Sequence, residues 1–114
     1  KDFEKSFVIN TRSTLKLIQI FDPLLKKSKI QTAIFLDDQN SGKFLSSYAS
    51  SKASTREIIK IYQEESKRIG TKVIIFHPKP MPTGLRAKFY PGEDTQKLSS
   101  CESQAQKLII KANL

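Results

Sequence analysis

The chain has one histidine, His77, and one cysteine, Cys101, the residue types that most often carry acid-base and nucleophilic chemistry. A thiol-imidazole pair needs both side chains within hydrogen-bond reach, and neither has a partner at a recognisable spacing. Cys101 recurs with apolar residues on one predicted helical stripe, which favours a buried structural thiol. His77 ends an apolar run and precedes Pro78, so we interpret it as a strand-end residue with a structural or surface role.

Asp37 and Asp38 are the only adjacent aspartates, and such a pair can bind Mg²⁺ beside a phosphate substrate. Both also lie at the start of a predicted turn, where short polar side chains hydrogen-bond the local backbone. The turn explains the pair without a metal. Two further acidic pairs are typical of a solvated helix surface and of a helix N-terminus: Glu64–Glu65 and Glu93–Asp94.

The glycines do not form a phosphate-binding loop. All four lie where turns are expected, and no two have the spacing of a nucleotide fingerprint: Gly42, Gly70, Gly84 and Gly92. Together with the isolated His77 and Cys101, this pattern predicts a non-catalytic protein with no cofactor and no metal. The proline-rich segment from His77 to Pro82 is either a stiff hairpin connection that continues into another strand, which we favour, or a polyproline ligand.

Charge is the strongest functional signal, because 20 Lys and Arg face 11 Asp and Glu, a formal net charge of +9. Such an excess usually meets nucleic acid, an acidic protein or a lipid surface. In the predicted helix from Ser54 to Ile69, acids offset much of the basic charge. The predicted binding residues are the cations that lack this compensation, with one neighbouring aromatic: Lys26, Lys27, Lys29, Lys79, Arg86, Lys88 and Tyr90.

Two functions are consistent with these residues. The first is a nucleic-acid-binding domain, with RNA or a ribonucleoprotein favoured over sequence-specific DNA, because no recognition-helix motif or zinc finger is present. The second is a protein-protein interaction domain of a larger assembly, which binds an acidic partner or forms a homodimer. We expect an intracellular protein, cytoplasmic or nuclear, because a single cysteine excludes an internal disulfide. No apolar stretch approaches the length of a membrane span.

The elements that must position these residues begin with an edge strand over residues 6–10. A helix follows over 12–27, its apolar face recurring at helical spacing and its course interrupted by Pro23. That face consists of Leu15, Ile18, Phe21 and Leu25. Strands at 32–36 and 43–48 are predicted to form an antiparallel hairpin.

After an exposed serine-rich connection, the capping-box pattern Ser54–Glu57 predicts the start of the middle helix. A central strand at 72–77 follows, and then a strand at 85–90 whose basic face carries Arg86, Lys88 and Tyr90. The last helix is predicted from about Asp94, with an apolar stripe along it. The stripe consists of Leu98, Cys101, Ala105, Leu108 and Ala112.

The predicted order is therefore strand, helix, hairpin, helix, hairpin, helix. This order indicates an α+β fold, in which helices pack on a mostly antiparallel sheet of four or five strands. The length suits one domain over residues 1–114, and the absence of an initial methionine suggests a domain excised from a longer chain.

Overall fold

The computed structural model describes residues 2–40 and 42–114, and the chain divides into two compact units. The first unit extends to Ile75, and the second runs from Phe76 to Leu114. The expectation of one domain over 1–114 remains a prediction, because compactness alone does not show whether two units unfold together.

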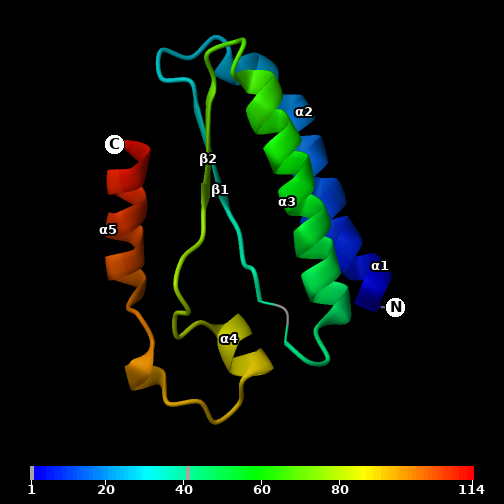
Figure 1. The fold of residues 1–114 in the computed structure, drawn as a ribbon, viewed down its shortest axis with the longest axis vertical. Coiled ribbons are helices and arrows are strands. Elements are labelled where there is room, and N and C mark those ends of the chain that lie inside the picture. Colours follow the sequence, from blue (N-terminus) through cyan, green and yellow to red (C-terminus); the bar gives the residue numbers. More distant parts are fainter. Residues whose placement is uncertain (1, 41) are drawn as a thin grey trace. The chain divides into compact units, whose positions relative to one another are not determined.

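The first unit begins with three consecutive helical segments: α1 (Asp2–Ser6), the π-helical η1 (Phe7–Arg12) and α2 (Ser13–Leu25). They form one continuous rod (Figure 1). In the π-helical turn the backbone N–H of Ser13 donates to the carbonyl of Val8, five residues earlier. The edge strand predicted at 6–10 is therefore wrong. Its β-prone residues are helical because Asn10 and Thr11 hydrogen-bond to another helix.

Pro23 does not interrupt α2, contrary to the sequence-based expectation. Proline removes one backbone donor and crowds the preceding turn, which breaks a helix most severely in its middle. Here it lies in the last turn, two residues before Leu25, so the helix loses little by containing it.

The rest of the first unit is a βαβ arrangement: β1 (Thr32–Leu36), α3 (Ser46–Ser66) and β2 (Lys72–Phe76). The two strands are parallel and form the only sheet in the described residues. The predicted antiparallel sheet of four or five strands is therefore wrong. The segment predicted as the hairpin's second strand instead leads into α3, and a helix between two strands returns the chain for parallel pairing.

α3 begins eight residues before the predicted capping box at Ser54. The serine-rich stretch is not an exposed connection, because Ser51 is fully buried and Thr55 is 7% exposed. The side chain of Asn10 donates to the Ser51 hydroxyl (2.9 Å), and the Thr55 hydroxyl donates to the Asn10 carbonyl (2.9 Å). These bonds satisfy small polar groups that would otherwise be buried alone. Gly70 follows the helix with φ of 82°, as its C-terminal position predicts.

The hydrophobic core of the first unit lies between the helices and one face of the sheet. Ile59 and Tyr62 of α3 pack against Val73 of β2. The partly buried residues around them come from α2 and from both strands: Ile18, Ala33, Phe35 and Ile75. Because alternate strand residues share a face, α2 and α3 cover the same side of the sheet. Figure 1 shows both helices on that side.

The second unit contains three short helical elements after an extended proline-rich segment: α4 (Gly84–Phe89), η2 (Thr95–Lys97) and α5 (Cys101–Ala112). The strand predicted at 85–90 is wrong. The hydroxyl of Thr83 accepts a hydrogen bond from the Arg86 backbone N–H (3.2 Å) and so caps a helix there. In the same way Ser100 caps α5, which starts later than predicted. Cys101 is exposed rather than buried, because the residues that α5 buries are Gln104 and Ala112.

Polar contacts hold the extended segment against the end of the second unit. The backbone N–H of Lys79 donates to Oε1 of Gln104 (2.9 Å), and that of Ser99 donates to the Pro80 carbonyl (3.1 Å). The ammonium of Lys111 lies 6.0 Å from the centre of the Phe76 ring. The stiff hairpin connection that we favoured for the proline-rich segment is wrong, because the segment leads into α4 rather than into a second strand.

Candidate protein-interaction surface

α2 presents apolar side chains on two different sides. On its inner side Ile18 packs against the core. On its outer side four large apolar residues remain about half exposed: Leu17 (52%), Ile20 (60%), Phe21 (49%) and Leu24 (58%). Their spacing of i, i+3, i+4 and i+7 places them on one continuous stripe. We refer to these four residues as the outer stripe.

α3 provides the contrast, because its outward side is mostly charged, although Ile61 is also 51% exposed. Glu57, Lys60, Glu64 and Lys67 are exposed at helical spacing, and the Lys67 ammonium lies 2.7 Å from the Glu64 carboxylate. This alternation of charge is typical of a solvated helix face. A helix that is apolar on more than one side is normally covered on each of them. Among the described residues, the outer stripe is therefore an apolar surface that remains about half exposed.

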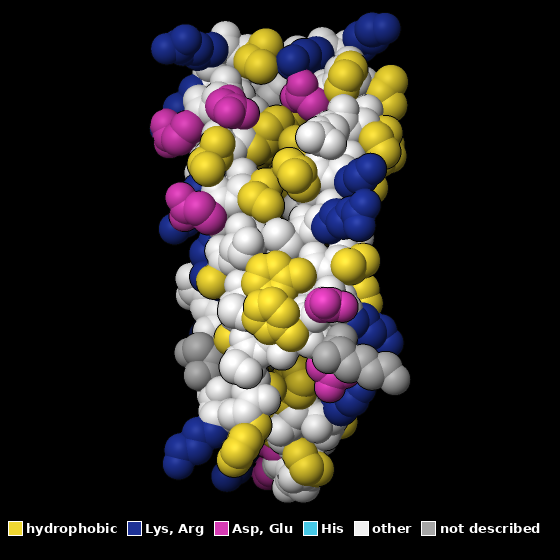
Figure 2. Space-filling model, turned by 90° about the vertical axis from the view of Figure 1, so that its right-hand side faces the viewer, with side chains coloured by type: hydrophobic (Ala, Val, Ile, Leu, Met, Phe, Trp, Pro, Cys, Tyr) yellow, Lys and Arg dark blue, Asp and Glu magenta, His cyan; other side chains and the backbone are white. Residues whose placement is uncertain are grey.

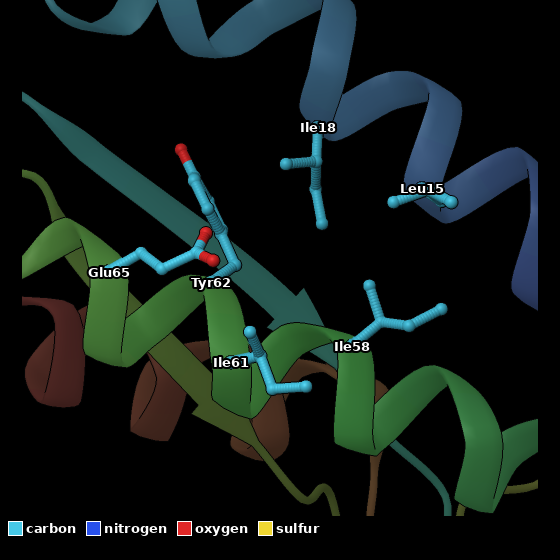
Figure 3. Close-up of a pocket in the computed structure, with 6 residues that line it drawn as sticks. All are labelled: Leu15, Ile18, Ile58, Ile61, Tyr62 and Glu65. Atoms are coloured by element: carbon cyan, nitrogen blue, oxygen red, sulfur yellow. The ribbon is translucent and has the colours of Figure 1, made fainter.

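A hollow lies between α2 and α3, and Ile18 of the inner side of α2 lines it. It has a volume of about 240 Å³, and Figure 3 shows its lining side chains reaching toward one another from the two helices. The lining consists of Leu15, Ile18, Ile58, Ile61, Tyr62 and Glu65. Hydrophobic side chains run down the seam between the helices, with charged side chains beside them (Figure 2). Glu65 gives the rim of this hollow a negative charge.

A second hollow extends the apolar surface toward the N-terminus. It has a volume of about 370 Å³ and adjoins the outer stripe at Leu17, one of its lining residues. Val8, which is 48% exposed, lines it together with Arg12 and Lys16. The apolar surface therefore continues beyond α2 into η1, and cations border it.

The charge around the outer stripe is strongly positive. Between Arg12 and Ile30 the chain has five basic side chains and one acidic side chain, Asp22. Asp22 is already engaged, because its carboxylate lies 2.7 Å from the Lys26 ammonium and accepts a hydrogen bond from the Tyr62 hydroxyl (2.9 Å). The hydrogen bond from Lys26 and then that from Tyr62 lower the pKa of Asp22, against the opposing effect of burial. The other cations, all exposed, form no ion pair within the described residues: Arg12, Lys16, Lys27 and Lys29.

The structure places the first predicted basic cluster next to the outer stripe. Lys26 follows the last residue of α2, and Lys27 and Lys29 lie in the turn beyond it. Lys26 is partly neutralised by Asp22, whereas Lys27 and Lys29 project into solvent. The sequence predicted the charge at this place, and the structure adds the apolar surface beside it.

The second predicted cluster belongs to the second unit and has a different character. The Arg86 guanidinium stacks 4.0 Å from the centre of the Tyr90 ring, and its Nε and Nη2 each donate to the Glu93 carboxylate at 2.9 Å. The hydrogen bonding from Arg86 lowers the pKa of Glu93. Lys79 and Lys88 are exposed, but no strand face joins them to Arg86. Arg86 thus fastens α4 to the following turn.

The predicted acidic pair Asp37–Asp38 also has structural partners. The Arg56 side chain of α3 donates to the Asp37 carboxylate and to the Asp38 carbonyl, and the Tyr48 hydroxyl donates to Oδ2 of Asp38 (2.8 Å). Burial, followed by the neighbouring Asp38, raises the pKa of Tyr48. Asp38 also accepts from the Asn40 backbone, as a turn residue should. In residues 2–40 and 42–114, no three His, Cys, Asp or Glu side chains are grouped to hold a metal.

The sequence reasoning missed the outer stripe, apart from Phe21, which it assigned to the buried face. The sequence does contain a pattern that could have revealed the second apolar side of this helix. Between Leu15 and Leu25 the apolar residues occupy both the inner face and the positions between its members, so the helix is apolar on two sides. The hydrophobic periodicity of a helix identifies its more apolar face, and it does not reveal that a second face is apolar as well.

Comparison with known proteins finds no family model that matches this chain and no curated protein that resembles it significantly. Among the helices in the described residues, none combines the length and hydropathy that crossing a bilayer requires.

Proposed function

We propose that this chain is a protein-interaction domain that binds an acidic protein partner through the outer stripe of α2. The main support for this proposal is the exposure of four apolar side chains on a helix whose opposite side already packs on the core. They are Leu17, Ile20, Phe21 and Leu24. Covering such a surface removes apolar area from water, which is the main favourable term in protein association. The apolar surface therefore supplies a reason for contact that a purely basic patch does not.

Charge complementarity supports an acidic partner. Arg12 and Lys16 lie beside one end of the apolar surface, and Lys27 and Lys29 lie beyond the other. Asp22 is engaged within the unit, and these four cations form no ion pair among the described residues. A partner with carboxylates around an apolar centre offsets this charge and associates faster through electrostatic attraction.

A second copy of the chain is a poorer occupant. A two-fold contact places the same surface on both sides of the interface, so the cations around one outer stripe meet the identical cations of the other. Like charges opposed across an interface weaken association. The charge pattern therefore argues against the homodimer that the sequence left open.

Nucleic acid is also less well supported than an acidic protein. The basic strand face proposed from the sequence is a helix, and Arg86 is occupied by Glu93 and Tyr90. Binding to phosphates needs cations, and binding to bases needs aromatic planes. Of the four residues of the outer stripe only Phe21 is aromatic. Aliphatic side chains at the centre of the basic surface suit a protein better.

The test is selection of peptides from a displayed random library, each of about 16 residues, the length that matches the apolar surface from Val8 to Leu24. We expect the enriched peptides to combine net negative charge with aliphatic or aromatic residues. The double variant Ile20→Ser/Leu24→Ser should lose them. Ile110→Ser is the matched control, because Ile110 is a 76% exposed apolar residue that belongs to the second unit.

The same protein is titrated with single-stranded RNA, duplex RNA and duplex DNA at two salt concentrations. Steeply salt-dependent RNA binding with no enrichment of acidic peptides would overturn the proposal in favour of nucleic acid. Enrichment of neutral or basic peptides, or binding that survives Ile20→Ser/Leu24→Ser, would overturn it as well. Circular dichroism of each variant verifies that the fold is retained.

A further inference from the structure

We infer, resting on the proposed function, that the partner's docking element is an amphipathic α-helix that packs along α2. Its apolar side covers the outer stripe and the hollow at Val8, and its acidic side chains meet the cations at both ends of that surface. This inference specifies the secondary structure and the charge pattern of the partner segment.

The length of the surface suits a helix. Leu17 and Leu24 are seven residues apart, so the outer stripe extends about 10 Å along the axis at 1.5 Å per residue. Continuing to Val8 brings the apolar surface to about 24 Å. A partner helix of about 16 residues covers this length, close to the usual size of helices in globular proteins.

The shape of the surface also suits a helix. Residues at i, i+3 and i+4 form ridges on a helix, and a neighbouring helix inserts its own side chains into the grooves between them. Leu17, Ile20 and Leu24 form such a ridge, and the hollow beside Leu17 can receive a side chain of the partner. An extended segment binds mainly through backbone hydrogen bonds to a sheet edge. The backbone N–H and C=O groups in the middle of α2 already hydrogen-bond within the helix, so none is free to bind an extended segment.

The position of Glu65 indicates that an acidic partner helix binds at the outer stripe rather than in the hollow between α2 and α3. Glu65 lines that hollow, so an acidic helix lying there meets a like charge. Arg12 and Lys16, four residues apart, lie on the same side of the rod and line the hollow at Val8. An acidic helix is thus attracted to the outer face of α2 and repelled from the seam with α3.

The test uses three synthetic peptides of about 18 residues. The first carries Leu, Ile and Phe at i, i+3, i+4 and i+7 spacing with Glu elsewhere, the second shuffles the same residues, and the third places a proline at the centre of the first. Binding to the whole chain is measured by fluorescence anisotropy. We expect the patterned peptide to bind at least about tenfold more tightly than either other peptide, a difference of about 1.4 kcal/mol. Its helical circular dichroism should increase on binding.

Equal affinity of the patterned and shuffled peptides would overturn the helical mode while leaving the acidic partner intact. If no acidic peptide is enriched from the library and none of the three synthetic acidic peptides binds, the proposed function itself is overturned. The two failures are therefore distinguishable.

A charge exchange tests the placement of the helix. Lys16→Glu should weaken binding of the patterned peptide, and a peptide with Lys in place of its Glu residues near that end should restore it. Lys60→Glu is the matched control, because Lys60 is exposed on the outward side of α3. An equal effect of Lys16→Glu and Lys60→Glu would show that only net charge matters and would overturn the placement.

Discussion

The hydroxyl of Tyr62 donates a 2.9 Å hydrogen bond to Oδ1 of Asp22, 40 residues earlier in the chain. The bond joins α3 to the last turn of α2. The same Tyr62 ring meets Phe35 of β1 edge to face, with the ring centres 6.3 Å apart. One side chain thus connects both helices to the sheet and fixes the side of α2 that faces the core. The outer stripe is exposed because Asp22, Ile18 and their neighbours occupy the inner side.

Tyr62→Phe tests this connection. The variant keeps the ring and its contact with Phe35 but removes the donor, so the buried side of Asp22 loses a hydrogen bond. We expect the free energy of unfolding to fall by about 1.5 to 3 kcal/mol, as for hydrogen bonds to charged groups. Urea denaturation measures the change. A double-mutant cycle with Asp22→Ala, which removes the acceptor, isolates the coupling, and additive effects would contradict the bond's role.

The pKa of Asp22 predicts how stability responds to acid. Because Lys26 and Tyr62 lower that pKa below its ordinary 3.8, the folded state holds the proton less tightly than the unfolded state. The stabilisation is therefore present above the ordinary value and is lost as the pH falls through the lowered one. We expect Asp22→Asn to show a shallower loss of stability than the wild type below about pH 5. Identical acid profiles from thermal unfolding would refute the assignment.

At alkaline pH the sign reverses for Tyr62. Burial, followed by the Asp22 carboxylate, raises its pKa above the ordinary 10.0. The stabilisation is present below that value and disappears as the pH rises through the higher folded-state pKa. Tyr62→Phe should remove this part of the loss of folding stability at alkaline pH. Measuring the free energy of unfolding at a series of pH values from about 9 upward, about one unit below the ordinary tyrosine pKa, detects the change. An unchanged alkaline slope would mean that another group titrates.

Asp37 and Arg56 form a largely buried ion pair, with side chains 3% and 19% exposed. Asp37→Ala leaves the guanidinium without its counter-charge, so we expect a loss of about 3 kcal/mol in the free energy of unfolding. Arg56→Lys should not preserve stability, since a lysine cannot bind the Asp37 carboxylate and the Asp38 carbonyl in the same fork. The exposed Glu57→Gln is the control, with an expected change within about 0.5 kcal/mol. Losses of similar size in all three variants would contradict the buried pair.

Arg86 and Lys88 offer a matched comparison in the second unit, because each lies in α4 and carries one positive charge. Arg86→Ala removes the stacking on Tyr90 and both bonds to Glu93, whereas Lys88→Ala removes an exposed side chain. We expect amide hydrogen exchange in residues 84–94 to become faster in the Arg86 variant and to stay unchanged in the Lys88 variant. Equal exchange in both would show that the cluster does not hold α4 in place.

Much of the local structure could be predicted from the residues themselves. The apolar, β-branched runs at 32–36 and 72–76 are strands, and the segment from Ser54 onward is a helix ended near Gly70. These segments combine strong propensity with clear boundary signals, and their surroundings agree with both. The basic cluster at Lys26 to Lys29 was also visible, because charge is a property of composition.

Other features depended on contacts between residues far apart in the chain. Phe7 to Ile9 is helical rather than extended, and Ser46 to Ala53 is helical rather than a loop, because Asn10 and Thr11 hydrogen-bond across to Ser51 and Thr55. Local propensity differs by well under 1 kcal/mol per residue between such alternatives, so a few buried hydrogen bonds decide them.

The sequence by itself determined that the chain is strongly basic and that α2 is rich in apolar residues. Only the tertiary structure decided that the strands pair in parallel and that Leu17, Ile20, Phe21 and Leu24 face solvent. The physical reason is that a helix with two apolar sides can bury either one. The side of α2 that contacts Tyr62 and the core faces α3 and the sheet, and the outer stripe on the other side remains about half exposed.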